Sequence, residues 1–228
     1  MSYRTGPKIV TDGLVLCLDA ADRNSYPGTG STWGDLSGNG NNGTLAPTNP
    51  TFSFLNGGYL DFNGSNQYAS VSDSNNQLIS NNLTEMTIEA FAKSDIASNA
   101  SIAGNFSTVT GSVGARLNWR ALGGVVWMSF GEAGLDSVVT ASVSPGVWYH
   151  IVGTVIENSS VSIYINGVIK NSTSTTKTFN GTEPFYIGKG DFGEYFNGAI
   201  STIRVYNRAL YSQEIRQNFE ATKGRFGL

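Results

Sequence analysis

Acidic residues that lie close together in the sequence are the first groups that could do chemistry. Hydrolysis of a glycosidic bond with retention uses two carboxyl groups that flank the bond, about 5–5.5 Å apart. The acidic neighbours in this chain are Asp19 with Asp22, Glu85 with Glu89, and Asp191 with Glu194. None of these pairs makes the pattern of carboxylates along one strand face that such an enzyme needs. We interpret all three as solvated or turn carboxylates and predict that the chain is not an enzyme.

The sequence offers little material for nucleophilic, metal or phosphate chemistry. Its single histidine, His150, lies in a core-type strand, where a packed or hydrogen-bonded role is simpler than a triad or a multi-histidine metal site. Its single cysteine, Cys17, has no disulfide partner and is interpreted as a small buried hydrophobic residue. Residues 188–193 spell Gly-x-Gly-x-x-Gly, but no helix pattern follows, so we interpret them as a turn.

Aromatic and amide side chains give the sequence the means to bind sugars. Aromatic faces stack on sugar rings, while amides and carboxylates bind hydroxyl groups. The four tryptophans are Trp33, Trp119, Trp127 and Trp148. Trp33 lies in a polar segment and is the better candidate for ligand binding, although its ring could simply cap the core. The other candidate ligand-binding residues are Asp35, Asn39 and Asn42.

Calcium is the one metal that these side chains suggest. Hard cations bind several carboxylate, amide and backbone oxygens, which turn-rich loops at the edge of a sandwich can bring together. Asp19 and Asp35 are the candidate metal ligands, with Asn39 and Asn42 beside them. The alternative for Asp35, which we favour, is an acceptor in an Asx turn that holds the loop from Ser37 to Gly40.

Length and charge limit the classes of partner. The 228 residues are enough for a substantial core, and we predict one domain over residues 1–228. The formal net charge is −3, so no positive excess exists to neutralise phosphates, and we predict neither a nucleic-acid nor a membrane partner. No apolar run approaches the roughly 20 residues of a membrane span and no signal peptide is recognisable, so we expect a mature start at Met1 in a reducing cytoplasm.

Short apolar and β-branched runs separated by turn residues predict an all-β fold, a two-sheet antiparallel sandwich. The expected strands are 14–19, 59–62, 67–71, 86–92, 101–106, 115–119, 125–130, 148–156, 161–165, 168–170, 185–187 and 199–206. Asn166-Gly167 predicts a hairpin with a type I′ turn, because both residue types tolerate positive φ. The Gly- and Asn-rich segment from Ser31 to Pro50 is interpreted as an ordered loop.

One short helix is predicted near the carboxyl end of the chain. Ser212 can cap it, Glu214 sits favourably in its first turn, and Gly224 can end it. Ile215 and Phe219 fall on one face of this helix, which we expect to pack against an edge of the sandwich.

Three stretches together resemble the concanavalin A-like lectin/glucanase superfamily, in its laminin G-like branch. They are GLVLCLDAADRNSYPGTGSTWGDLSGNGNNGTL from Gly13, GGYLDFNGSNQYASV from Gly57 and NGAISTIRVYNRALYSQEIRQNFEATKGRFGL from Asn197. The resemblance implies a jelly-roll sandwich. The Glu-x-Asp-x-x-Glu motif of its glucanases is absent. Where related domains carry acidic residues in a Gly-x-Ile-Asp-Glu-type strand, this chain has Ser201 and Thr202, which counts against calcium.

Two shorter motifs, Ser-Tyr-Pro-Gly-Thr-Gly and the terminal Lys-Gly-Arg-Phe-Gly-Leu, resemble versions of this domain in virion proteins of tailed, especially marine, bacteriophages. That resemblance implies a non-catalytic virion structural protein, either a capsid decoration or a tail-fibre-associated module. The expected partners are other virion proteins, a host surface glycan and further copies of the chain, with a trimer as our guess. The alternatives are a bacterial carbohydrate-binding or adhesin module and, third, an enzyme whose acidic residues converge only in three dimensions.

Overall fold

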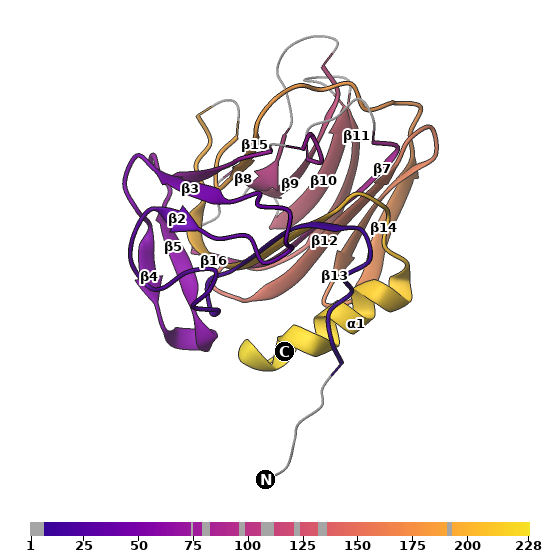
Figure 1. Ribbon diagram of the computed structural model, residues 1–228. Helices are drawn as coiled ribbons and strands as arrows, with labels where there is room; N and C mark the ends of the chain where they lie inside the picture. Colours follow the sequence, from indigo (N-terminus) through magenta and orange to yellow (C-terminus); the bar gives the residue numbers. More distant parts are fainter. Residues whose placement is uncertain are drawn as a thin grey trace.

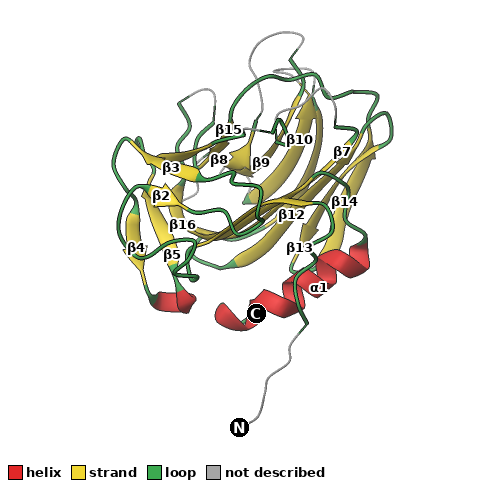
Figure 2. Ribbon diagram, viewed as in Figure 1, coloured by secondary structure: helices red, strands yellow, loops and turns green. Residues whose placement is uncertain are grey.

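Two antiparallel β-sheets packed face to face make up the computed structural model, which describes residues 7–73, 75–78, 83–95, 99–105, 112–120, 124–131, 136–190 and 193–228 (Figure 1). The predicted all-β, two-sheet antiparallel sandwich with one short C-terminal helix is confirmed, and Figure 2 shows how strands dominate the chain.

The first sheet, called sheet A, has the strand order β14-β13-β12-β7-β16-β5-β4, and β1 pairs with the second half of β16. Its strands are β1 Leu14–Asp19, β4 Thr51–Ser53, β5 Tyr59–Asn63, β7 Glu85–Ser94, β12 Tyr149–Ile156, β13 Ser160–Ile165, β14 Val168–Ser174 and β16 Asn197–Tyr206. The predicted hairpin is confirmed between β13 and β14, where Asn166 and Gly167 have φ of 52° and 75°.

The second sheet, called sheet B, has the order β11-β10-β9-β8-β15-β6-β3-β2. Its strands are β2 Thr32–Trp33, β3 Gly43–Ala46, β6 Tyr68–Val71, β8 Ala100–Gly104, β9 Gly114–Arg120, β10 Val125–Gly131, β11 Ser137–Ser142 and β15 Phe185–Ile187. The segment from Ser31 to Pro50 is therefore not all loop, because it supplies β2 and β3. Phe106, the expected end of one strand, lies outside the described residues.

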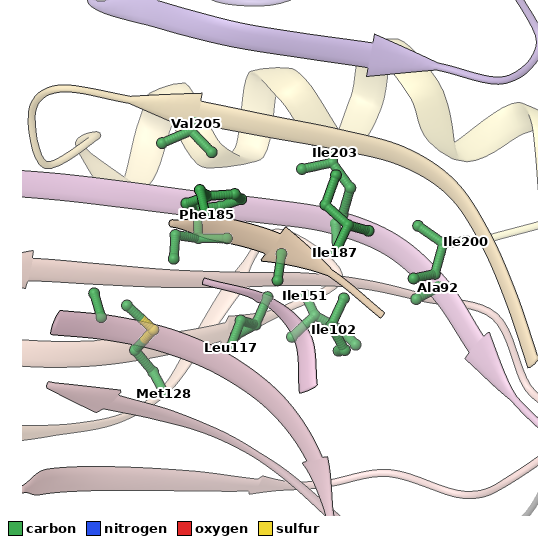
Figure 3. Packing of buried hydrophobic residues seen from close by; sticks show 14 of the residues in the cluster. Ala92, Ile102, Leu117, Met128, Ile151, Phe185, Ile187, Ile200, Ile203 and Val205 are labelled. Atoms are coloured by element: carbon green, nitrogen blue, oxygen red, sulfur yellow. The ribbon is translucent and has the colours of Figure 1, made fainter. Parts of the chain in front are cut away.

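The hydrophobic core lies between the sheets, as Figure 3 shows. Leu117 and Met128 from sheet B point towards Ile151 from sheet A, and none of the three is exposed. Gly153 in the middle of β12 makes this packing possible, because a Cβ there would lie 2.3 Å from Sδ of Met128. A glycine inside a strand often marks such a close approach.

Helix α1, Ser212–Thr222, covers part of the outer face of sheet A (Figure 1). Ile215 and Phe219 are buried, as predicted. The end positions differ from the prediction: Ser212 is the first helical residue rather than the cap, and the helix ends at Thr222, before a short 3-10 turn, Lys223–Arg225. Glu214 acts in the first turn, where its carboxylate accepts a hydrogen bond from the backbone N–H of Tyr211 at 2.8 Å.

A buried polar cluster joins α1 to sheet A. Glu89 on β7 accepts hydrogen bonds from the Arg204 guanidinium and from Asn218 of the helix, the latter at 2.7 Å. His150 lies 3.2 Å from the same carboxylate and stacks against Phe91. The interpretation of His150 as a packed side chain is confirmed. The hydrogen bond from Asn218 to Glu89 joins the helix to sheet A.

Candidate functional site

Trp33, the predicted sugar-stacking residue, lies inside the core. Its ring has no exposed area and belongs to the hydrophobic cluster between the sheets. A buried ring offers no face to a ligand, so Trp33 is not the binding residue that its polar neighbourhood suggested. The alternative, that Trp33 caps the core, describes its position.

Asp35 organises its own loop. Its Oδ1 accepts hydrogen bonds from the backbone N–H of Cys17 at 2.8 Å and of Ser37 at 2.9 Å. Its Oδ2 accepts from the Ser37 hydroxyl at 2.7 Å and from the Asn41 N–H at 3.0 Å. The Asx-turn interpretation of Asp35 is therefore confirmed, and both carboxylate oxygens are already engaged by the chain.

Asn39 and Asn42 belong to the same hydrogen-bonded loop. Asn42 Oδ1 accepts from the backbone N–H of Asp35 at 2.8 Å, and Asn39 Nδ2 donates to the carbonyl of Leu14 at 3.2 Å. The structure thus brings Asp35, Asn39 and Asn42 together, but as a scaffold that ties the loop to β1.

Asp19, the second candidate metal ligand, forms an ion pair instead. Its Oδ2 lies 2.8 Å from Nη1 of Arg225, and its Oδ1 accepts from the backbone N–H of Ala21. Across the described ranges, no group of three or more His, Cys, Asp or Glu side chains is placed to hold a metal ion. Cys17 is buried, and burial raises its pKa to about 11, so the thiol is a poor nucleophile at neutral pH.

The sequence did not single out the outer face of sheet B, where polar and aromatic side chains gather. Alternation along each strand separates the two faces: Leu117 and Met128 point into the core, while Asn118 and Ser129 point away from it. We define the sheet B face by its outward residues, which are Tyr68, Ser101, Gly104, Arg116, Asn118, Trp127, Ser129, Tyr186, Lys189, Glu194 and Tyr195.

Antiparallel register arranges this face in two rows across β8, β9 and β10, which lie side by side in Figure 1. In one row, Asn118 stands between Ser101 and Trp127. In the other, the residues run Tyr186, Gly104, Arg116 and Ser129 from β15 to β10. Gly104 is packed closely against β9, since a Cβ there would lie 2.4 Å from the carbonyl oxygen of Ala115 and 2.7 Å from Cα of Arg116.

Hydroxyl and side-chain amide atoms of the strands β8, β9 and β10 on this face are buried and lack a hydrogen-bond partner within the described chain. They are Ser101 Oγ, Asn118 Nδ2 and Ser129 Oγ, and their residues are at most 3% exposed. Each such group costs about 1–3 kcal/mol in a folded protein. Groups of this kind are rare in native proteins, and a function at the site is one explanation.

A cluster of tyrosines continues the face beyond Gly104. Tyr68 and Tyr186 meet edge to face with ring centres 5.7 Å apart, and Tyr195 lies 6.4 Å from Tyr68. The Lys189 ammonium lies 4.7 Å from the centre of the Tyr68 ring and 4.6 Å from that of Tyr186. All three rings are half-buried, and we call Tyr68, Tyr186 and Tyr195 the tyrosine cluster.

The turn that carries Lys189 connects the two halves of the face. The N–H of Gly190 donates to the carbonyl of Glu194 at 2.7 Å, while Asp191 and Phe192 of the predicted turn lie outside the described residues. Glu194 then forms an ion pair with Arg116 at 3.6 Å. Of the sheet B face residues defined above, Glu194 alone carries a carboxylate.

The chain therefore forms a sandwich of two antiparallel sheets whose sheet B face combines aromatic and polar side chains. The family model described as the concanavalin A-like lectin/glucanases superfamily matches residues 63–216, so the chain belongs to this superfamily. A search of curated proteins finds no relative that matches. The described residues contain no helix long and apolar enough to span a membrane.

Solved structures share the fold at low sequence identity. The binding domain of botulinum neurotoxin DC, solved with rat synaptotagmin II, has a TM-score of 0.72 and 13% identity, over 93% of this chain and 52% of that one. Domain 4 of AbnA, an extracellular arabinanase from Geobacillus stearothermophilus solved with arabinotriose, has a TM-score of 0.69 and 17% identity, over 91% of this chain and 98% of that one. The chain thus spans about half of the neurotoxin binding domain and nearly all of the arabinanase domain.

Proposed function

We propose that this domain binds a carbohydrate on the sheet B face and does not cleave it. The observation that carries the proposal is the tyrosine cluster, whose half-buried rings offer an accessible surface in register beside the polar row of Ser101, Asn118 and Ser129. Hydroxyls and an amide are the groups that sugar hydroxyls satisfy, and tyrosine rings cover the apolar faces of sugars.

The tyrosine cluster adds free hydroxyl groups. Within the described chain the hydroxyls of Tyr68, Tyr186 and Tyr195 make no hydrogen bond. A half-buried ring with a free hydroxyl offers both an apolar surface and a polar tip, and its position is already fixed by neighbouring rings. A ligand that lies on this surface loses less free energy to ordering than it would on mobile side chains.

The arabinanase domain supports this function by analogy, since it has the same fold and was solved with an oligosaccharide bound. Fold alone does not fix function, so the argument depends on the residues of the sheet B face. Among the described residues of that face, no second carboxylate lies opposite Glu194, which supports binding rather than hydrolysis.

Binding by single-site variants tests the proposal. Against glycans that bind the wild type, we expect Tyr186→Ala and Asn118→Ala to weaken binding at least about tenfold, equivalent to about 1.4 kcal/mol. Tyr211→Ala is the matched control, because Tyr211 is 73% exposed and precedes α1 on the side of sheet A. The proposal is overturned if no glycan binds, or if Tyr211→Ala weakens binding as much as Tyr186→Ala does.

We further propose a setting for this domain, a virion of a tailed bacteriophage, with a host glycan or a neighbouring virion subunit as partner and self-association as a trimer. The support is the resemblance of the Ser-Tyr-Pro-Gly-Thr-Gly and Lys-Gly-Arg-Phe-Gly-Leu motifs to those of phage versions. Mass spectrometry of purified particles should find the chain at a fixed copy number. Its absence from particles favours the alternative, a bacterial carbohydrate-binding or adhesin module.

A further inference from the structure

The charges of the sheet B face are unequally matched. Arg116 is paired with Glu194, at 3.6 Å. Lys189 forms no ion pair with any carboxylate within the described residues, whereas its ammonium lies over the rings of Tyr68 and Tyr186. The face therefore has one positive charge without a matching negative one, although the whole chain carries a formal net charge of −3.

The surroundings of Lys189 hold its ammonium in place without satisfying it. A ring face attracts a cation through its quadrupole but accepts no strong hydrogen bond. The ammonium group has three N–H donors, and none of them donates a hydrogen bond to an oxygen of the tyrosine cluster. Holding the group near the ligand site lowers the entropic cost of using it for binding.

The same segment touches the polar half of the face. A Cβ on Gly190, the residue after Lys189, would lie 2.7 Å from Oε2 of Glu194 and 3.5 Å from Nη1 of Arg116. One continuous surface thus contains the Lys189 ammonium, the tyrosine cluster and the row that runs from Tyr186 through Arg116 to Ser129. A ligand that covers the rings comes within reach of the Lys189 charge.

We infer that the sugar bound on this face carries an anionic group, a carboxylate or a sulfate, which Lys189 contacts. This inference rests on the proposed carbohydrate binding and specifies its ligand class. Hydrogen bonds between an ammonium and an anionic oxygen are stronger than those between neutral groups, so the charge should decide between otherwise equal sugars.

Pairs of glycans that differ in charge test the inference. The uronate pair is tetragalacturonate and its full methyl ester, which keep one sugar skeleton while the ester removes the charge. The sulfate pair is κ-carrageenan tetrasaccharide and its desulfated form, which likewise keep one sugar skeleton. We expect the wild type to bind the charged member of at least one pair at least about tenfold more tightly, and raising sodium chloride from about 50 to about 500 mM should reduce that preference. The pair that shows the preference identifies carboxylate or sulfate as the group.

Lys189→Met removes the charge and keeps most of the stem. We expect it to abolish the preference, so that the charged and uncharged members of the pair bind equally. Lys170→Met is the matched control, because Lys170 is an exposed lysine on β14 of the other sheet. Equal binding of charged and uncharged members by the wild type, or a preference that survives Lys189→Met, overturns the inference while carbohydrate binding stands. If neither pair binds and a wider glycan array is also negative, both proposals are overturned.

Discussion

The Glu89 carboxylate and the Arg204 guanidinium form an ion pair in which Glu89 has no exposed side-chain surface and Arg204 is 4% exposed. Removing one member of a buried pair leaves the other charged and unpaired, which costs about 3–5 kcal/mol. We expect Glu89→Gln to lower the free energy of unfolding by that amount, as measured by urea denaturation. A loss below about 1 kcal/mol would show that the pair contributes little.

Glu89 also predicts how stability depends on pH. Burial alone would raise the pKa of Glu89. The nearby Arg204 charge has the largest opposing effect, and together with His150 and Asn218 it lowers this pKa to about 2, below the ordinary value of 4.5. A depressed pKa in the folded state gives stability that is present above pH 4.5 and lost as the pH falls towards 2. We expect urea midpoints of the wild type to fall across this window. The midpoints of Glu89→Gln should fall less, and parallel curves would contradict the assignment.

Gly153 and Met128 predict a coupled pair of substitutions in the core. Gly153→Ala places a methyl group 2.3 Å from Sδ of Met128, and such overpacking costs about 1–3 kcal/mol. We expect Met128→Ala to destabilise on its own, because it leaves a cavity. In the double variant the two effects should partly cancel, and a double-mutant cycle measures the coupling. Strict additivity would mean that the side chains do not compete for the same space.

Replacing Asn118 with leucine should stabilise the fold and weaken glycan binding. Because Asn118 Nδ2 is buried without a partner, Asn118→Leu removes an unsatisfied donor and should raise the free energy of unfolding by about 1 kcal/mol. The same change should weaken glycan binding at least as much as Asn118→Ala does. Thermal denaturation and titration on the same preparation check both effects. A variant that is destabilised but binds normally would show that Asn118 serves the fold.

A substitution at Asp35 tests whether this residue stabilises its loop without taking part in glycan binding. Asp35→Asn replaces one acceptor oxygen with an amide donor, and we expect a loss of about 1–3 kcal/mol in unfolding free energy. Glycan binding should stay unchanged, because Asp35 does not belong to the sheet B face. Millimolar calcium chloride should leave the melting temperature of the wild type unchanged. A calcium-dependent increase that Asp35→Asn removes would restore Asp35 as a metal ligand.

Local pattern was enough to predict much of the fold. Alternation along the strand before Asn166-Gly167 specified the hairpin, because both the strand and its turn are encoded within a few neighbouring residues. Ile215 and Phe219 were placed correctly on the buried side of the helix for the same reason. The short strands β2 and β3 were not predicted, since β3 depends on pairing with the more distant β6 and β2 pairs only with β3.

The candidate site was harder to predict because it depends on register between strands that are far apart in the sequence. Asn118 shows the difficulty: alternation in β9 indicates that it points away from Leu117, but only pairing puts it beside Ser101 and Trp127. Trp33 shows the converse, because its polar sequence neighbours conceal a ring that the core surrounds. Trp127, on the sheet B face, is half-buried rather than enclosed.

Helix α1 covers the outer face of sheet A, so the two outer faces of the sandwich differ. The chain around Val10 is hydrogen-bonded to Asn218 of α1, and Phe226 near the other end stacks on Phe91 of β7. Both entry and exit of the described chain therefore lie on the side opposite the sheet B face (Figure 1). A partner joined through either end would therefore lie on the side of α1, and the tyrosine cluster on the opposite side would stay accessible to a ligand.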